Sequence, residues 1–243
     1  MIGTPELDLQ LLARILQGVD IAIYSVDYRL APQNPFPAAL DDAMTVLRWL
    51  TAEGAKFGID PQNIAVGGNS AGGGLAAALA QRACDESIPL TFQLLMYPML
   101  DDRTACRANH GGRGELVWTP SNNRYGWASY LGHAPGTEQR PLPYAVPARR
   151  EKLVELPPAW IGVGSLDLFY EENREYTERL RAAGVVCALD VVADAPHAFD
   201  LFNFGSERVR AFHDRMIASL ISAYGRRAAG RTVVGRKDRR IDP

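Results

Sequence analysis

Short hydrophobic segments alternate with longer amphipathic segments along this chain. The short segments, which are expected to form strands, are IAIYSVDY (21–28), NIAVGGN (63–69), FQLLMYP (92–98), AWIGVG (159–164) and CALDVV (187–192). Several of them are apolar at consecutive positions, as is typical of strands that are covered by helices on both faces. The alternation predicts βα units around a mostly parallel central sheet, which is an α/β fold.

Amphipathic segments with helical spacing lie between these strands. They cover residues 6–17, 37–57, 71–85, 171–183 and 205–224. Pro37 stands at the start of the second segment, where a missing backbone N–H costs nothing. Gly184 follows the fourth segment and suits the left-handed conformation that ends many helices. We therefore expect helices to flank the sheet.

Residues 101–157 fit no βα unit. This stretch is rich in glycine and proline and contains Trp118 and Trp127. Long insertions in α/β folds often shape a substrate pocket. We therefore expect a small cap or insertion over one end of the sheet.

Length and charge bound the domain organisation. With 243 residues, 47% of them hydrophobic and 22% charged, the chain can bury one large core as a soluble globular protein. A net charge of −2 gives no reason to expect a nucleic-acid or membrane partner. Residues 225–243 carry seven Arg and Lys against two Asp and lack an apolar face. We expect a domain over residues 1–224 and a disordered basic tail over 225–243.

The cysteines and the N-terminus indicate the compartment. Cys84, Cys106 and Cys187 are odd in number and lack CxxC spacing, so neither a disulfide framework nor a metal site is expected. The opening MIGTPELDLQLL is not a signal peptide, and no apolar run is long enough to span a membrane. A cytoplasmic location is the expectation.

A motif typical of a nucleophilic serine lies between a predicted strand and a predicted helix. Residues Gly68-Asn69-Ser70-Ala71-Gly72 match the pattern G-x-S-x-G. Such a serine sits on a sharp strand-to-helix turn, where side chains at the flanking glycine positions would collide with neighbouring backbone. The N–H of Ala71, at the helix N-terminus, is the natural donor to a developing oxyanion. The alternative is a phosphate-binding turn with a bystander serine, but no P-loop lysine follows the glycines.

A nucleophilic serine needs a histidine as its base. His197 comes just after the strand segment 187–192, at the sheet edge where catalytic groups gather in parallel sheets. His213 falls within a helical segment and is expected to be packed or on the surface. His110 and His133 fall in the insertion and are expected to be surface loop residues.

The histidine in turn needs a carboxylate that fixes its tautomer. Asp167 follows the strand segment 159–164 and completes the chain order Ser70, Asp167, His197, which is the order of α/β-hydrolases. The alternatives for this role are Asp194, Asp200 and Glu171. Asp200 stands too close to His197 in sequence to be the first choice.

Five segments together resemble the hormone-sensitive-lipase-like family of α/β-hydrolases, which includes bacterial carboxylesterases and arylacetamide-deacetylase-like enzymes. Ala198 stands where the family usually has glycine. The segments are VDYRLAPQNPFPAALDDA (26–43), GGNSAGGG (67–74), YPMLDDRTA (97–105), LPPAWIGVGSLDLFYEENREY (156–176) and APHAF (195–199).

This resemblance implies an α/β-hydrolase fold and hydrolysis of short- to medium-chain carboxylic esters without a cofactor. Ser70 would attack the ester carbonyl, His197 would accept its proton and Asp167 would orient His197. The partner would be a small-molecule ester, although amide or lactone hydrolysis uses the same residues. The oligomeric state stays open, with a homodimer as one option. Residues next to strand ends that could line the substrate pocket are Tyr97, Leu100, Phe169 and Phe199.

The sequence departs from the family at one motif. Family members carry a His-Gly-Gly-Gly loop before the nucleophile, whose N–H groups supply most of the oxyanion hole, and no such motif precedes Ser70. The triplet at residues 110–112 follows the nucleophile and cannot replace it. We therefore expect a family member that lacks its first part, roughly 70–90 residues. In the family's sheet order, one strand of that missing part lies between the strands expected at 21–28 and 63–69. A non-catalytic or crippled hydrolase-like protein that binds small molecules is the alternative.

Overall fold

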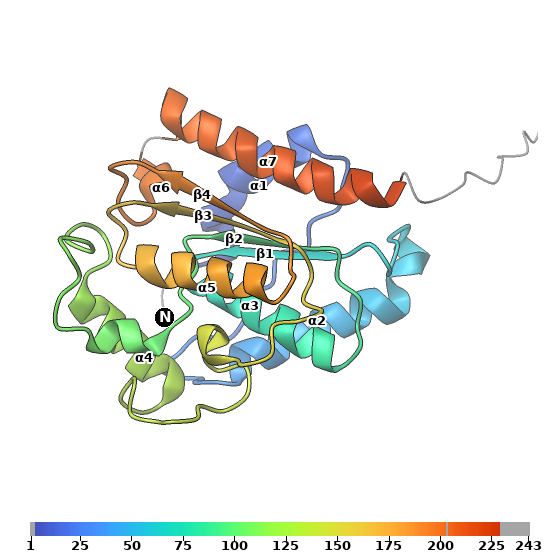
Figure 1. Ribbon diagram of the computed structural model, residues 1–243. Helices are drawn as coiled ribbons and strands as arrows, with labels where there is room; N and C mark the ends of the chain where they lie inside the picture. Colours follow the sequence, from blue (N-terminus) through green and yellow to red (C-terminus); the bar gives the residue numbers. More distant parts are fainter. Residues whose placement is uncertain (1–2, 203, 229–243) are drawn as a thin grey trace, which may run out of the picture.

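The computed structural model describes residues 3–202 and 204–228. Four strands form one sheet in the order β1-β2-β3-β4, and every neighbouring pair is parallel. They are β1 (Ala65–Asn69), β2 (Phe92–Met96), β3 (Ala159–Gly164) and β4 (Cys187–Val192). Their carboxyl ends share one edge, on the left in Figure 1. Loops that leave this edge can therefore meet in a single site.

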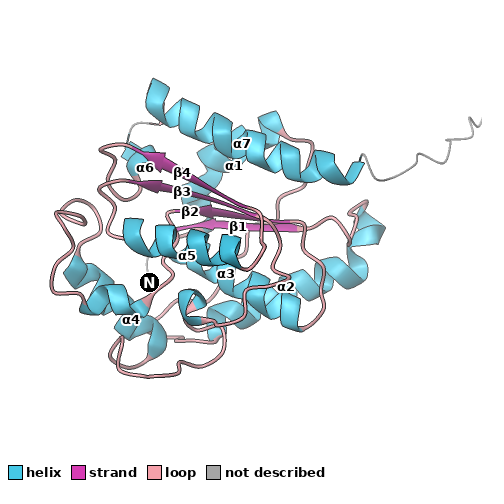
Figure 2. Ribbon diagram, viewed as in Figure 1, coloured by secondary structure: helices cyan, strands magenta, loops and turns pink. Residues whose placement is uncertain are grey.

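Helices cover both faces of the sheet (Figures 1 and 2). One face is covered by α1 (Leu9–Gly18) and α7 (Glu207–Ala228), and the other by α2 (Ala38–Glu53), α3 (Ser70–Asp85) and α5 (Tyr170–Ala182). The remaining elements are η1 (Pro5–Asp8), η2 (Gly54–Phe57), η3 (Asp102–Cys106), α4 (Pro120–Leu131), η4 (Pro147–Arg149) and α6 (Phe199–Phe202).

Each face of the sheet has its own hydrophobic core. On the α1 and α7 side, Trp160 of β3 packs against Phe212 of α7 with ring centroids 5.3 Å apart. On the opposite side, Ile161 of β3 is buried in the cluster that α2, α3 and α5 form with the sheet. Because successive side chains of a strand point to opposite faces, β3 is buried along its whole length. This double cover explains its continuous apolar sequence.

The segment 101–157 packs on the loops at the carboxyl edge of the sheet. Trp127 of α4 shares a buried cluster with Leu168 and Phe169, which follow β3. The start of α4 is capped by Thr119, whose hydroxyl accepts the Asn122 N–H at 3.3 Å. This insertion therefore lies where the sequence predicted it, beside the loops that carry the site.

The predicted α/β fold is confirmed, as are four of the five predicted strands: β3 and β4 have the predicted bounds, and β1 and β2 are each two residues shorter. The strand predicted at 21–28 is wrong, because this segment is not hydrogen-bonded into a sheet. A strand exists through its ladder partners, and among the described residues β1 pairs only with β2. Tyr24, within the segment, is 42% exposed and packs edge-on against Trp49.

Helix boundaries also differ from the prediction, beginning with segment 6–17, where the 3-10 turn η1 precedes α1. The segment 37–57 is interrupted, because α2 ends at Glu53 and a tighter 3-10 turn, η2, completes it. Helix α7 continues through Ala228, past the predicted end at residue 224, so the start of the expected basic tail is helical. The rest of that tail, residues 229–243, lies outside the described residues.

Candidate active site

The turn from β1 to α3 presents Ser70. Strand β1 ends at Asn69 and α3 begins at Ser70, whose φ of +51° is a left-handed conformation that non-glycine residues rarely adopt. The Met99 N–H donates to the Ser70 carbonyl oxygen at 3.0 Å and ties this turn to the loop after β2. The first N–H groups of a helix have no partner within it. Ala71 is the second residue of α3, so its N–H is one of the donors at the N-terminus of this helix that have no acceptor within it.

Glycines allow this turn to close tightly. A Cβ atom added at Gly68 would lie 2.4 Å from the Gly72 carbonyl oxygen, and one at Gly74 would lie 2.1 Å from the Met99 carbonyl oxygen. A Cβ atom added at Gly72 would have the Tyr28 hydroxyl as its nearest neighbour, at an ordinary 3.7 Å. The expectation that both glycines flanking the serine avoid a collision is therefore correct for Gly68 and wrong for Gly72.

The structure brings Ser70, His197 and Asp167 together. The Ser70 hydroxyl lies 2.8 Å from Nε2 of His197, and Nδ1 of His197 lies 2.8 Å from Oδ2 of Asp167. His197 is 4% exposed and Asp167 is fully buried. With Nδ1–H donated to the carboxylate, Nε2 of the neutral imidazole is an acceptor that faces the serine hydroxyl. This arrangement can take a proton from Ser70.

The carboxylate is fixed from both sides. Oδ1 of Asp167 accepts the Phe169 N–H at 2.8 Å, while Oδ2 accepts Nδ1–H of His197. The three alternative carboxylates lie elsewhere: Glu171 forms ion pairs with two arginines, Asp194 is exposed in the turn after β4, and Asp200 contacts Tyr97 and His213.

The other histidines do not contact Ser70 or Asp167. His133 lies near Glu138 (3.5 Å), and burial lowers the pKa of His110 in the insertion. His213 is fully buried and contacts Asp200. The expectation of a surface loop therefore fits His133, and the packed alternative fits His213.

Three aromatic rings surround the His197 imidazole. Tyr97 and Phe169 contact it edge-on, with centroid distances of 4.9 Å and 5.1 Å, and Trp118 of the insertion lies at 6.3 Å. Sequence reasoning placed Trp118 only within the insertion. The one feature of the sequence that could have indicated this contact is the position of Trp118 just before Thr119, the N-cap of α4.

The four residues predicted to line a substrate pocket are buried. Tyr97 and Phe169 are at most 1% exposed and pack around His197. Leu100 is fully buried in the core on the α3 and α5 side, and Phe199 packs against Phe212 of α7. Position next to a strand end does not distinguish a pocket wall from core packing, so the pocket role of these four residues stays a prediction.

A family model for the alpha/beta hydrolase fold matches residues 1–201. The chain belongs to this family. The resemblance to hormone-sensitive-lipase-like hydrolases that the motifs indicated is thereby confirmed.

Relatives of this α/β-hydrolase include enzymes named as esterases. Esterase LipI of Mycobacterium tuberculosis is 40% identical over 171 residues, which cover 69% of this chain and 52% of LipI. Carboxylesterase NlhH of the same species is 36% identical over 187 residues, which cover 75% of this chain and 57% of NlhH. The chain thus spans little more than half the length of these curated relatives.

Solved structures show the same fold. Esterase LipW from Mycobacterium marinum superposes with a TM-score of 0.82 and 36% identity, over 92% of this chain and 69% of LipW. A bacterial heroin esterase superposes with a TM-score of 0.86 and 31% identity, over 92% of this chain and 71% of that enzyme. The sheet and its flanking helices are therefore those of α/β-hydrolases.

A carboxylate beside the nucleophile was missed by sequence reasoning. Asp8 of η1 accepts a hydrogen bond at 2.9 Å from the side-chain amide of Asn69, the residue before Ser70. Burial raises the pKa of Asp8, the Asn69 amide opposes this, and the charge of Asp200 adds to the rise. Burial and the Asp8 charge also raise the pKa of Tyr28. No motif connects residues 8 and 69, so only the fold could reveal this contact.

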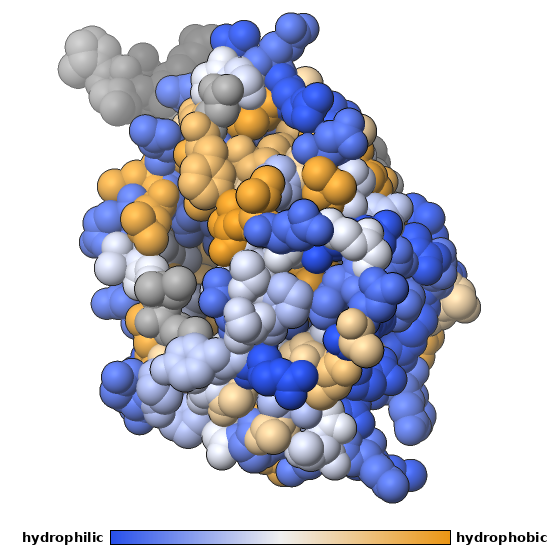
Figure 3. All heavy atoms as spheres, turned by 90° about the vertical axis from the view of Figure 1, so that its left-hand side faces the viewer, coloured by the Kyte–Doolittle hydropathy of each residue, from blue (hydrophilic) through white to orange (hydrophobic). Residues whose placement is uncertain are grey.

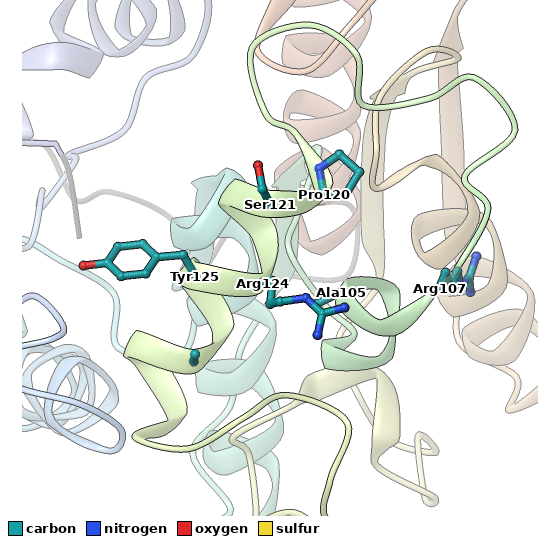
Figure 4. A pocket seen from close by; sticks show the side chains of 7 residues that line it. Ala105, Arg107, Pro120, Ser121, Arg124 and Tyr125 are labelled. Carbon is teal, nitrogen blue, oxygen red and sulfur yellow. The ribbon is translucent and has the colours of Figure 1, made fainter.

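Two further features lie near the carboxyl edge of the sheet. Figure 3 shows this face, where hydrophobic side chains gather in the upper half. A surface depression of about 470 Å³ lies between η3 and α4 (Figure 4). Its lining does not include Ser70, Asp167 or His197, so it is not the reaction site. The lining residues are Ala105, Arg107, Pro120, Ser121, Arg124, Tyr125 and Ala128.

Residues 3–202 and 204–228 contain neither a cluster of metal ligands nor a membrane-spanning helix. No group of three or more His, Cys, Asp or Glu side chains in this part of the hydrolase could hold a metal ion. None of its helices combines the length and hydrophobicity needed to cross a bilayer. The three cysteines have free thiols, and burial raises the pKa of Cys187 to about 11.

Proposed function

We propose that this chain carries the catalytic centre of a serine carboxylesterase that hydrolyses short- to medium-chain esters. The observation that carries the proposal is the continuous hydrogen-bonded line from the Ser70 hydroxyl through His197 to Asp167, with both distances at 2.8 Å. Named esterases among the relatives support the same reaction class.

In the first half of the reaction, the Ser70 oxygen attacks the ester carbonyl while Nε2 of His197 accepts the hydroxyl proton. Asp167 stabilises the imidazolium that forms and holds Nδ1–H in the required tautomer. The N–H of Ala71 donates to the oxyanion of the tetrahedral intermediate. His197 then returns its proton to the departing alcohol, which leaves an acyl group on Ser70.

The second half repeats the sequence with water. Water attacks the acyl carbonyl while His197 accepts one of its protons, and collapse of the intermediate releases the acid and restores the Ser70 hydroxyl. The rings of Tyr97, Phe169 and Trp118 surround the imidazole, which limits its reorientation between the two steps. The proposed reaction uses neither a metal nor an organic cofactor.

The oxyanion site is the weakest part of the proposed machinery. Each donor in such a site contributes on the order of 3–4 kcal/mol to transition-state stabilisation. Ala71 is the donor that we assign, and the sequence before Ser70 contains no His-Gly-Gly-Gly motif. For the residues of this sequence, the second candidate function is a hydrolase-like protein that binds small acyl compounds without turning them over.

Covalent labelling and turnover together separate the two candidates. We expect a fluorophosphonate probe to label Ser70, as located by mass spectrometry, and p-nitrophenyl acetate and butyrate to be hydrolysed. Both signals should disappear in Ser70→Ala. Ser87→Ala is the matched control, because Ser87 also has a left-handed backbone, with φ of +56°, but lies in the turn after α3.

An N-terminally extended form should be assayed beside the 243-residue chain, because further oxyanion donors would raise turnover. Labelling of Ser70 without ester turnover in either form would support the binding candidate. Absence of labelling at Ser70 in a folded protein would contradict the esterase proposal.

A further inference from the structure

A second buried polar group lies directly behind the candidate active site. The Tyr97 hydroxyl donates to Oδ1 of Asp200 at 2.8 Å, and Nε2 of His213 lies 3.2 Å from Oδ2 of the same carboxylate. All three residues are at most 1% exposed. Tyr97 follows β2, Asp200 lies on α6 and His213 lies on α7. The group thus connects the sheet to two helices.

Buried carboxylates need hydrogen-bond donors to offset the loss of water. Each oxygen of Asp200 has one donor, the Tyr97 hydroxyl or the His213 imidazole. Burial, followed by the charge of Asp200, raises the pKa of Tyr97 well above its ordinary value. The phenol therefore keeps its proton, and its hydrogen bond, throughout the pH range of an esterase assay.

This group reaches His197 by two routes. The Tyr97 ring contacts the imidazole edge-on, at 4.9 Å and 70°. Tyr97 is itself held in a left-handed conformation, with φ of +36°, and its N–H donates to the Gly162 carbonyl oxygen at 2.6 Å. The second route is the chain, because Asp200 follows His197 by three residues on the short helix α6. A movement of Asp200 would therefore shift both the ring against His197 and the backbone that carries it.

We propose that Asp200, held between Tyr97 and His213, is a positioning residue that sets the orientation of the His197 imidazole toward Ser70. This inference rests on the proposed function, because it assigns a role in that reaction. It predicts an effect on the chemical step, since a small misplacement of a catalytic group costs rate more than binding.

Two conservative substitutions test the inference. Tyr97→Phe keeps the ring against His197 but removes the donor to Asp200, and Asp200→Asn keeps the size and one acceptor but removes the charge. We expect each to lower kcat about 10- to 100-fold with KM changed less than twofold. The matched control is Tyr176→Phe, which removes an equally buried hydroxyl that accepts the Gln81 amide at 3.1 Å, on α5. It should leave kcat unchanged.

The pH profile distinguishes the two variants. The titratable groups around Tyr97 and His197 are Asp8 on η1, Asp167 after β3, Asp200 on α6 and His213 on α7. Asp200→Asn removes a negative charge that favours the imidazolium, so the acidic limb of kcat/KM should move to lower pH. Tyr97→Phe removes no charge and should lower the profile without moving this limb. A merely structural role would lower the profile in both variants and would leave the acidic limb of Asp200→Asn unmoved.

A readout that does not require turnover completes the test. The Nδ1–H proton shared by His197 and Asp167 should give a low-field proton NMR signal in the native protein and in Tyr176→Phe. In Tyr97→Phe and Asp200→Asn this signal should shift or broaden. Native kcat and an unchanged NMR signal in both folded variants would overturn the inference. Absence of Ser70 labelling in the native protein would instead overturn the proposed function, and the NMR signal would still decide the positioning role.

Discussion

Two buried aspartate–histidine pairs lie within this one domain, and their geometries differ in an informative way. In the Asp167–His197 pair, the carboxylate takes Nδ1 at 2.8 Å and leaves Nε2 facing the Ser70 hydroxyl. In the Asp200–His213 pair, the carboxylate lies 3.2 Å from Nε2 of His213. Nδ1 of His213 has no hydrogen-bond partner among the described residues. Burial next to a carboxylate is thus common to both pairs. What separates them is the group that meets the second nitrogen.

A histidine beside a carboxylate is not by itself a catalytic base. The imidazole must present an acceptor nitrogen to a nucleophile, and the nitrogen bound by the carboxylate decides which one is left free. The outer nitrogen, Nε2, can reach a partner on another loop, whereas Nδ1 lies close to the residue's own backbone. The first pair therefore leaves a nitrogen free to face Ser70, whereas the second pair holds Tyr97 and α6 behind His197.

The largest difference is expected when the same substitution is made in both pairs. His197→Gln should lower kcat for p-nitrophenyl acetate about 10⁴-fold or more, because it removes the base. His213→Gln should lower it only about tenfold, because it acts through Asp200 and Tyr97. Steady-state kinetics on both variants measure the gap. Equal losses in two folded variants would remove the distinction between the pairs.

The carboxylates should differ in the same direction. Asp167→Asn should lower kcat by about 10⁴-fold, because an amide in this place favours the wrong tautomer of His197. Asp200→Asn should reach at most about 100-fold, as expected for a residue that acts at a distance. Activity of Asp167→Asn near that of the wild-type protein would show that another carboxylate orients the base.

Only the Asp167–His197 pair contacts a serine, and the position of that serine, Ser70, depends on the tight turn after β1. Gly68→Ala should lower the free energy of unfolding by about 1–3 kcal/mol, because its Cβ would lie 2.4 Å from the Gly72 carbonyl oxygen. Gly72→Ala is the control, with its nearest contact at 3.7 Å, and should change stability by about 0.5 kcal/mol or less. Urea unfolding of both variants compares them. A more stable Gly68→Ala would contradict the described geometry.

The smallest effect concerns Asp8, a carboxylate near the Asp200–His213 pair. The negative charge of Asp200 disfavours the charged form of Asp8. Its folded-state pKa is raised, mainly by burial, so the wild-type protein loses stability as pH rises through that pKa. Asp8→Asn removes this loss and can still accept the Asn69 amide. The variant should melt slightly higher than the wild type at neutral pH and equally below the ordinary aspartate range. Thermal melts at both pH values test this, and a reversed sign would contradict it.

The sequence predicted what local patterns and chain order can encode. Apolar runs over 92–98 and 159–164 identified strands, and Ser70, Asp167 and His197 stood out because each follows a strand at the same sheet edge. The Asp200–His213 contact did not stand out, because it depends on how α6 turns into α7. Asp8 and Trp118 reach the site through tertiary packing that no local spacing specifies.

The failed strand at 21–28 has a different cause. Its β-branched and aromatic residues satisfy the strand pattern, but pairing depends on a neighbour that local sequence does not reveal. The pocket role predicted for Leu100 and Phe199 stays a prediction, because a position next to a strand end fits both a core and a cavity wall. Burial of one side chain by another is decided by the assembled fold.

The placement of β1 has a consequence for motion. Among the described residues this strand, which delivers Ser70, is bonded on one side only, whereas β3 has neighbours on both sides. Backbone amides with a single neighbouring strand open to solvent more readily than those in the middle of a sheet. Hydrogen exchange along Ala65–Asn69 should therefore outpace exchange along Ala159–Gly164. Ser70 therefore follows an edge strand of the sheet, whereas Asp167 follows a strand that has neighbours on both sides.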